Sequence, residues 1–367
     1  MSTRVLVCCG SGGVGKTTTS AALALALARA GKSVAVLTID PARRLADSLG
    51  LDELGNEPQQ VPMDRLGQGS GRLDAAMLDM KATWDGLVSR FSDNDLDRDR
   101  ILANRYYRFA STRLAGSHEY MAMERLYELV ESGRYEFVLL DTPPTRHAIE
   151  FLKAPARIAG LFDEGVMHWL SLPRDSRGFR ALERGSEAVV KVLKRLIGQG
   201  TISEIAEFFD AMKGLWDTLR ERGKAVEALL ASEDTRFLLV TTPAPAARAE
   251  AREFRRLLEQ QGMPLGGFLV NRVVPAPESE AAPGPELFPA PPPGFDEREW
   301  TEICEGVARA PELQARLATS EQDSLRELAG EGVQTWHIPE LDNDVHSLEG
   351  LAEIASYLQP AVEALTR

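Results

Sequence analysis

The 367-residue sequence has few cysteines, a deficit of basic residues and no long apolar run. None of its three cysteines, Cys8, Cys9 and Cys304, belongs to a C-x-x-C pair, so the sequence offers no zinc or iron–sulfur motif and is typical of a reducing cytoplasm. The net charge of −13 gives no bulk attraction to nucleic acid or to an anionic membrane. We expect neither a membrane-spanning segment nor a secretion signal, because apolar runs are short and the first expected strand begins almost at the N-terminus. These features together predict a cytoplasmic globular protein.

Alternating apolar runs and helical periodicities indicate an α/β fold. Buried strands are expected at residues 5–9, 34–39, 137–140, 237–240 and 268–270, with a short one near 333–338. Helical spacing covers 72–133 and 151–231, a segment near 299–330, and a last helix from Leu348. The alternation predicts a mainly parallel, doubly wound sheet with right-handed crossovers.

The same pattern divides the chain into a sheet domain and a helical insert. The sheet domain is expected to comprise residues 1–71, 134–150 and 232–367, and residues 51–70 are expected to be irregular. The mainly helical segments 72–133 and 151–231 would form an all-helical subdomain that is inserted in two pieces. Residues 273–298 carry many prolines, which predicts an exposed, mobile loop.

One glycine-rich stretch carries the strongest functional signal: Gly10-Ser11-Gly12-Gly13-Val14-Gly15-Lys16-Thr17-Thr18. It fits the phosphate-loop pattern G-x-x-x-x-G-K-[ST], with an apolar run before it and an Ala/Leu-rich helical segment after it. Glycines let successive backbone N–H groups turn toward phosphate oxygens, and the following helix adds the positive end of its dipole. Lys16 would bind the outer phosphates and the Thr17 hydroxyl would ligate Mg²⁺. The alternative is a glycine-rich turn that binds nothing.

Two carboxylates are expected at the same edge of the sheet. Asp40 follows the second strand and Asp141 follows the strand at 137–140. The carboxyl ends of parallel strands are where open α/β sheets bind ligands, so both side chains are candidates for contact with a nucleotide. The alternative for each is a helix cap or a closed turn.

The loop, Asp40-Pro41-Ala42 and Asp141-Thr142-Pro143-Pro144-Thr145-Arg146-His147, in this order, resemble the deviant-Walker P-loop ATPases. More narrowly they are similar to the ArsA-type branch, which holds the arsenite-pump ATPase and the factor that targets tail-anchored membrane proteins. The resemblance covers 1–50, 134–150 and 235–275 and implies a P-loop NTPase fold that binds ATP and Mg²⁺ and hydrolyses ATP to ADP.

The resemblance also implies roles for single residues. Lys16 and Asp40 would be catalytic, with Asp40 orienting the attacking water. Thr17 would bind Mg²⁺ directly, whereas Asp40 and Asp141 would act on the metal through water. Asn271, followed by Arg272, matches the residue that hydrogen-bonds adenine in the family; its alternative is an ordinary strand-end turn residue.

The chain departs from the family pattern at three points. Ser11 replaces the signature lysine, which reaches across a dimer to the partner's phosphates; we expect weak ATPase activity as a homodimer unless Arg43 or Arg44 compensates or a lysine-bearing paralogue is the partner. Arg146 stands where the family usually has glycine, and either restricts the motion of that segment or supplies a charge. The zinc-binding C-x-x-C and the arsenite-binding cysteines are absent, so a zinc-stapled dimer is not expected and metalloid transport loses most of its support.

The leading hypothesis is a dimeric ATP-driven switch whose helical insert binds an apolar client helix or a membrane-protein partner. The insert carries methionines and tryptophans that could form a flexible groove, although packing between its helices is the favoured interpretation: Met77, Met80, Met121, Met123, Met167, Met212, Trp84, Trp169 and Trp216. One alternative is a weakly or non-hydrolysing subunit of a heteromeric complex. Another is a positioning ATPase of the MinD/ParA type, against which the acidic last helix counts. A cluster-inserting ATPase would need paired thiolates, which the sequence lacks.

Overall fold

One eight-stranded sheet organises the protein. The computed structural model describes residues 3–40, 44–66, 71–92, 94–105, 107–108, 111, 117–143, 213–277, 290–294, 296–330 and 332–367. The strands are β1 (Arg4–Gly10), β2 (Ser33–Thr38), β3 (Gln59–Gln60), β4 (Arg72–Met77), β5 (Phe137–Asp141), β6 (Thr235–Thr241), β7 (Leu265–Val273) and β8 (Thr335–Pro339). Their order is β3-β4-β2-β5-β1-β6-β7-β8, and every neighbouring pair is parallel except β3 with β4. The mainly parallel sheet predicted from the sequence is confirmed.

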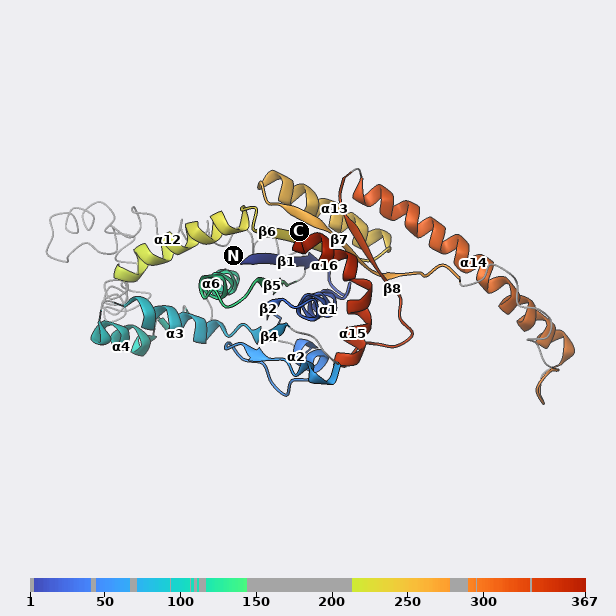
Figure 1. Ribbon diagram of the computed structural model, residues 1–367, viewed down its shortest axis with the longest axis horizontal. Coiled ribbons are helices and arrows are strands. Elements are labelled where there is room, and N and C mark those ends of the chain that lie inside the picture. The colour runs from blue at the N-terminus through green and yellow to red at the C-terminus, as the bar shows by residue number, and fades with distance from the viewer. Residues whose placement is uncertain are drawn as a thin grey trace, which may run out of the picture.

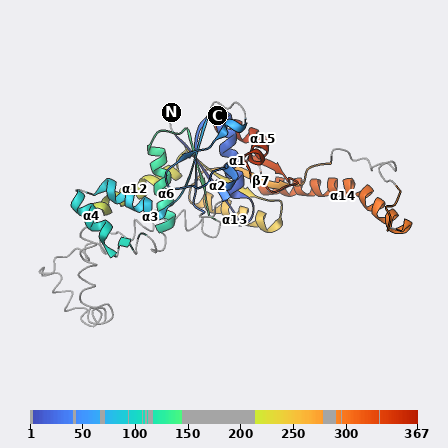
Figure 2. The same ribbon diagram turned by 90° about the horizontal axis from the view of Figure 1, so that it is seen from below.

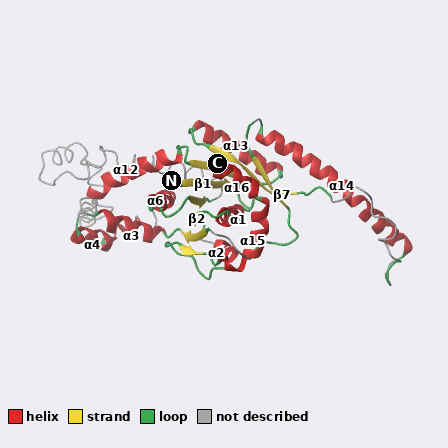
Figure 3. Ribbon diagram, viewed as in Figure 1, coloured by secondary structure: helices red, strands yellow, loops and turns green. Residues whose placement is uncertain are grey.

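Helices cover both faces of the sheet and create two apolar cores (Figure 3). One face is covered by α1 (Lys16–Arg29), α2 (Arg44–Leu49), α15 (Leu348–Tyr357) and α16 (Gln359–Thr366). The other face packs against α3 (Met80–Phe91), α4 (Asp95–Ala103), α6 (Ser117–Glu131), α12 (Lys213–Leu230), α13 (Pro245–Gln260) and α14 (Glu297–Ala329). A 3₁₀ turn, η1, spans Met63–Leu66. The sheet is therefore the middle of three layers, which is the doubly wound architecture.

The central part of helix α1 is buried on all sides, which explains its alanine- and leucine-rich composition. Every residue from Thr19 to Ala28 is buried, so the helix carries alanine and leucine on all sides instead of a single apolar stripe. Because α1 begins directly after the glycine-rich loop, this enclosure holds the first turn of the helix in a fixed position beneath the end of β1.

The described part of the helical insert extends beyond one end of the sheet, and α14 extends in the opposite direction (Figures 1 and 2). Trp84, Met121 and Met123 are buried in the core shared with the sheet, so these side chains pack helices together. Met77 and Met80 are partly buried against the two cores. Met167, Trp169 and Met212 lie outside the described residues, as does most of the second half of the insert.

The prediction that residues 72–77 are helical was wrong. Residues 72–77 form β4, which pairs with β2 inside the sheet, and the helical spacing begins only with α3. Asp74 interrupts the apolar run that would indicate a buried strand, because its carboxylate lies in the middle of this short segment. Asp74 is 1% exposed, and its burial is compensated by two hydrogen bonds from Arg72 and one from the Tyr135 hydroxyl. The segment 51–70, expected to be irregular, contains η1 and the short edge strand β3.

The C-terminal elements occur in the predicted order, except that the last predicted helix is divided into two, α15 and α16. Helix α14 and strand β8 lie where the sequence predicted them. The last helix is interrupted at Leu358, because Pro360 lacks the N–H that would continue α15, and α16 starts with that proline in its first turn. Of the proline-rich loop, residues 278–289 and 295 lie outside the described residues, and α14 begins at Glu297, just inside the expected limit.

A buried ionic network holds α12 against α6. Arg222 donates hydrogen bonds from Nε to Glu124 Oε1 (2.5 Å) and from Nη2 to Glu131 Oε2 (3.0 Å). Its guanidinium also lies over the rings of Phe91 and Tyr127. Burial raises the pKa of Glu124 to about 7, although the neighbouring Arg222 charge opposes that shift.

Candidate functional site

The glycine-rich loop connects the end of β1 to the start of α1 through two left-handed turns. Gly13 has φ 82° and Gly15 has φ 87°, a conformation that favours glycine. A Cβ on Gly10 would stand 2.2 Å from the Val240 carbonyl oxygen, and one on Gly15 would stand 2.3 Å from Asn271 Nδ2. Glycine at the first and sixth positions of the pattern is therefore required by the neighbouring strands β6 and β7.

The start of α1 offers hydrogen-bond donors to an anion. Gly15 occupies the N-cap position and no side chain caps the first turn. Lys16, which is 8% exposed, folds back and donates a hydrogen bond from Nζ to the Ser11 carbonyl oxygen at 2.8 Å. Burial lowers the pKa of Lys16, and the nearby Asp141 carboxylate opposes that shift. Backbone amides, a helix N-terminus and a buried ammonium group together form a phosphate-binding arrangement.

Asp141, the last residue of β5, is the polar centre of this edge of the sheet. Its Oδ2 accepts hydrogen bonds from the Thr17 hydroxyl (2.7 Å) and the Thr38 hydroxyl (3.0 Å). Its Oδ1 is buried and has no hydrogen-bond partner among the described residues. Burial raises the pKa of Asp141 to about 6, opposed by the two hydroxyl donors. A buried carboxylate oxygen without a partner is costly, which indicates that a cationic or hydrogen-bonding group completes this site.

The residues around Asp141 fit a hydrated Mg²⁺ ion. Thr17 gives its only hydroxyl proton to Asp141, which leaves the oxygen lone pairs of Thr17 free to bind a hard cation. The unpartnered Oδ1 of Asp141 can accept a hydrogen bond from a water molecule on that cation. Within the described ranges, no three His, Cys, Asp or Glu side chains converge on one point, so the remaining ligands would be water and phosphate oxygens.

Asp40 lies two residues beyond β2, beside Asp141. Its backbone N–H donates to the Thr38 hydroxyl oxygen at 3.2 Å. Its charge acts on both Lys16 and Asp141, so these three groups lie near one another at this edge of the sheet. Of the arginines considered as substitutes for the missing lysine, Arg44 is exposed on α2, whereas Arg43 and Arg146 lie outside the described residues.

Asn271, near the end of β7, contacts the glycine-rich loop. Its Nδ2 donates to the Val14 carbonyl oxygen at 3.0 Å, and its Oδ1 accepts from the Arg272 backbone N–H at 3.0 Å. Arg272 adopts φ 59°, at a point where the pairing of β7 with β8 shifts register. These two hydrogen bonds fix the orientation of the Asn271 amide beside the loop.

A cavity of about 410 Å³ adjoins Asn271 and the loop. It is lined by Gly15, Thr18, Asn271, Arg272, Ile354 and seven residues at the end of β8 and directly after it: Pro339, Glu340, Leu341, Asn343, Asp344, Val345 and His346. The sequence prediction placed Thr18, Asn271 and Arg272 together but missed the segment 339–346, which lies between a strand and a helix and carries no motif. Its one sequence signal is the position after a parallel strand, where ligand-binding loops occur.

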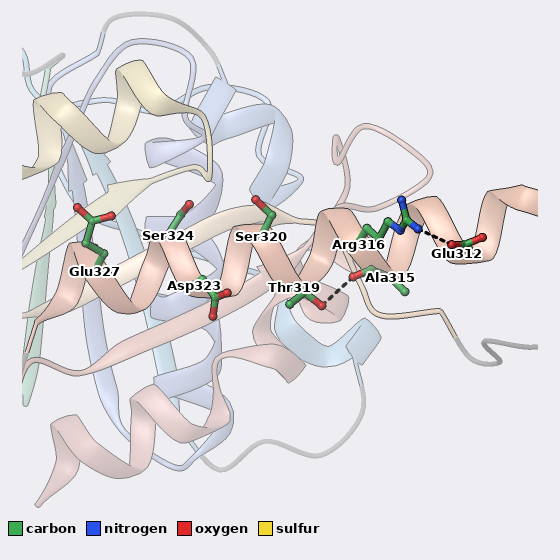
Figure 4. A pocket seen from close by; sticks show the side chains of 8 residues that line it. All are labelled: Glu312, Ala315, Arg316, Thr319, Ser320, Asp323, Ser324 and Glu327. Carbon is green, nitrogen blue, oxygen red and sulfur yellow. Dashed lines mark hydrogen bonds and ion pairs between the residues drawn. The ribbon is translucent and has the colours of Figure 1, made fainter.

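Two further hollows lie along α14, and neither is lined by residues of the glycine-rich loop. The larger, about 710 Å³, has described lining residues from α14 alone, including Glu312, Arg316 and Asp323 (Figure 4). The other, about 480 Å³, lies between α14 and the start of α13 and includes Arg248 and Arg272. Because the loop presents a helix N-terminus and a buried ammonium group, it is the candidate site for a phosphorylated ligand.

The sequence of this chain is similar to those of known ATPases. Residues 3–285 match the family model described as anion-transporting ATPase, ArsA_ATPase. A protein of Aquifex aeolicus, named as an arsenical pump-driving ATPase, is 25% identical over 278 residues, which are 74% of this chain and 64% of that protein. The protein named ATPase get3 of Aspergillus terreus is 34% identical over 150 residues, covering 40% of this chain and 41% of that protein. A Halobacterium salinarum protein, also named as an arsenical pump-driving ATPase, is 31% identical over 176 residues, covering 45% of this chain and 26% of that protein. The match thus spans less than two thirds of the length of each of these relatives.

Proposed function

Because the chain belongs to the anion-transporting ATPase family, of the ArsA type, we propose that it binds Mg-ATP at the glycine-rich loop and hydrolyses it to ADP and phosphate. The observation that carries this proposal is the geometry around Asp141. One oxygen of this carboxylate is buried without a partner among the described residues, and the other accepts the hydroxyl of Thr17 in the first turn of α1. Such an arrangement is costly in the absence of a ligand and complementary to a hydrated cation beside phosphates.

Each residue of this edge has a distinct task in the proposed reaction. The amides of the loop and of the first turn of α1 hold the phosphates. Lys16 releases the Ser11 carbonyl and places its ammonium group against the outer phosphate oxygens, where charge accumulates in the transition state. When bound, Mg²⁺ neutralises the same oxygens. Asp40 orients the attacking water, and Asp141 holds a water molecule of the metal shell while Thr17 is the direct protein ligand.

The adenine base would occupy the cavity beside Asn271. The amide of Asn271 presents one donor and one acceptor in a fixed orientation, which matches the donor and acceptor pair on one edge of adenine. The segment 339–346 would close the cavity on its far side. We therefore propose that Asn271 recognises the base. The backbone N–H of Arg272 fixes the orientation of the Asn271 side-chain amide.

We further propose that two chains act together and that nucleotide binding changes the position of the helical insert. The proposed insert contains α3, α4 and α6, which lie between β4 and β5 in the chain, and α12, which lies between β5 and β6. Its client would be an apolar helix or a membrane-protein partner, as for the family that the chain resembles. In the described part of the insert Trp84, Met121 and Met123 are buried, so the client surface would have to be formed by other residues.

Ser11 supports a variant of this proposal in which activity is low unless a lysine-bearing paralogue is the partner. The side chain of Ser11 is a neutral hydroxyl, and the residue is 8% exposed, so it cannot supply a positive charge to another chain. The second candidate function is therefore that of a weakly hydrolysing subunit in a heteromeric complex.

A membrane-positioning function is less well supported. Helices α15 and α16 pack Leu351, Leu358 and Leu365 into the core, so their apolar faces are already used. Among the described helices, none combines the length and apolarity that a bilayer span requires.

The decisive experiment is calorimetric titration of ATP with and without Mg²⁺, followed by measurement of phosphate release. Wild-type protein should bind ATP more tightly when Mg²⁺ is present and release phosphate, and Lys16→Ala should abolish the release. Lys224→Ala, on the exposed side of α12, is the matched control and should behave as wild type. Binding that does not depend on Mg²⁺, or phosphate release that survives Lys16→Ala, would refute the proposal.

A further inference from the structure

Thr38 links the two carboxylates of the site through a single hydroxyl group. The Thr38 hydroxyl donates to Asp141 Oδ2 at 3.0 Å and accepts the backbone N–H of Asp40 at 3.2 Å. A hydroxyl has one proton, so once that proton is given to Asp141 the Asp40 amide can bond only to the oxygen lone pairs. The hydrogen bonds therefore run in one direction, from Asp40 through Thr38 to the charged Asp141.

The position of Thr38 in the sheet explains why it can make both contacts. Thr38 is the last residue of β2 and is paired in register with Asp141, the last residue of β5. The backbone ladder continues for one more bond, from Ile39 N–H to the Asp141 carbonyl oxygen at 3.2 Å. Beyond Ile39 the chain leaves the sheet, and the Thr38 hydroxyl holds the next amide in place. Thr38 is 1% exposed, so water does not compete with these bonds.

We propose that Thr38 is a positioning residue that fixes the backbone of Asp40 relative to the Asp141 carboxylate, so that a change at Asp141 on metal binding moves Asp40. This inference rests on the proposed function, because it concerns how the attacking-water carboxylate is placed. Asp141 has one oxygen occupied by two hydroxyls and one oxygen open. Attraction of the open oxygen toward a hydrated cation rotates the carboxylate, and the Thr38 hydroxyl follows the oxygen to which it donates. The Asp40 amide then follows Thr38.

A purely structural role predicts different behaviour. If the Thr38 hydroxyl only compensates the burial of Asp141, its loss would weaken the fold and the metal site without any specific effect on Asp40. The two roles are separated by comparing Thr38→Val, which keeps the shape and loses the hydroxyl, with Thr38→Ser, which keeps the hydroxyl. Thr241→Val is the matched control, since Thr241 is also a buried threonine at the end of a parallel strand of this sheet.

The first measurement is hydrogen–deuterium exchange at the Asp40 amide in the protein without nucleotide, which is independent of activity. We expect the amide to exchange about ten-fold faster in Thr38→Val than in wild type, and at the wild-type rate in Thr38→Ser and Thr241→Val. Equal exchange in Thr38→Val and wild type would overturn the inference.

The second measurement is steady-state hydrolysis with a double-mutant cycle. Thr38→Val should lower kcat about ten-fold while the affinity for ATP without Mg²⁺ stays within about two-fold, and Thr38→Ser should restore kcat. In an Asp40→Asn background Thr38→Val should have little further effect on kcat, because the two residues act together. Additive losses, or a Thr38→Ser variant as slow as Thr38→Val, would overturn the inference. Absence of hydrolysis in wild type would instead refute the proposed function, and the inference would fail with it.

Discussion

Replacing Gly15 by alanine tests the architecture of the glycine-rich loop most directly. Gly15 has φ 87°, and an L-residue in the left-handed region costs about 1–2 kcal/mol. The added Cβ would also lie 2.3 Å from Asn271 Nδ2, so the amide must move and its hydrogen bond to Val14 must break. Loss of that bond costs about 1 kcal/mol. We therefore expect the free energy of unfolding to fall by about 2–3 kcal/mol in total.

Chemical denaturation measures this change, and nucleotide titration measures its consequence for binding. Because Asn271 is displaced from its fixed orientation, we expect the affinity for ATP to fall at least ~10-fold, which corresponds to about 1.4 kcal/mol. Gly12→Ala is the control in the same loop, since a Cβ at Gly12 meets no atom within 4 Å, and its unfolding free energy should stay within ~0.5 kcal/mol of wild type.

A double mutant separates the two contributions. In an Asn271→Ala background the steric conflict disappears, so Gly15→Ala should cost only the backbone term of about 1–2 kcal/mol. If Gly15→Ala proves no more destabilising than Gly12→Ala, the reasoning about the loop is wrong.

Three further predictions address other parts of the molecule. Gly86→Ala, at an exposed position inside α3 where a Cβ meets no atom within 4 Å, should raise the free energy of unfolding by about 0.5–1 kcal/mol; a lower thermal midpoint than wild type would contradict the helix assignment. The pKa of Glu124 is raised from its ordinary value of 4.5 to about 7, so the folded state keeps this proton in a range where the unfolded state has lost it. The stability of wild type relative to Glu124→Gln should therefore be greatest below pH 4.5 and fall by up to ~3 kcal/mol as the pH rises to 7, and denaturation series that run parallel across this window would contradict that pKa. Ser11→Lys should increase steady-state turnover of the homodimer about ten-fold or more if the missing charge limits hydrolysis, and fast turnover in wild type that the substitution leaves unchanged would show that it does not.

Local sequence patterns predicted the strands and the glycine-rich loop because both depend on short-range requirements. A buried parallel strand needs a continuous apolar run, and six of the eight strands lie at the predicted positions. The left-handed conformations of Gly13 and Gly15 favour glycine, so the loop can be recognised from the local sequence. The family membership follows from the same local motifs and was confirmed by the match over residues 3–285.

The elements that the sequence did not reveal depend on partners far away along the chain. Strand β4 contains Asp74, whose buried carboxylate accepts hydrogen bonds from Arg72 and also one from Tyr135, 61 residues away along the chain. The segment 339–346 borders a cavity with Gly15 and Asn271 only because β8 lies beside β7 at the edge of the sheet.

Sequence alone therefore determined the α/β alternation, the glycine-rich loop between β1 and α1, and the two carboxylates expected at strand ends. Tertiary structure alone decided that the Thr17 and Thr38 hydroxyls both point at Asp141, and that Asn271 reaches back to Val14 across 257 positions of the sequence. The physical reason is that backbone conformation is set by neighbouring residues, whereas the pairing of polar side chains is set by the order and register of strands. That order is fixed only when the apolar faces of the helices are buried on both sides of the sheet.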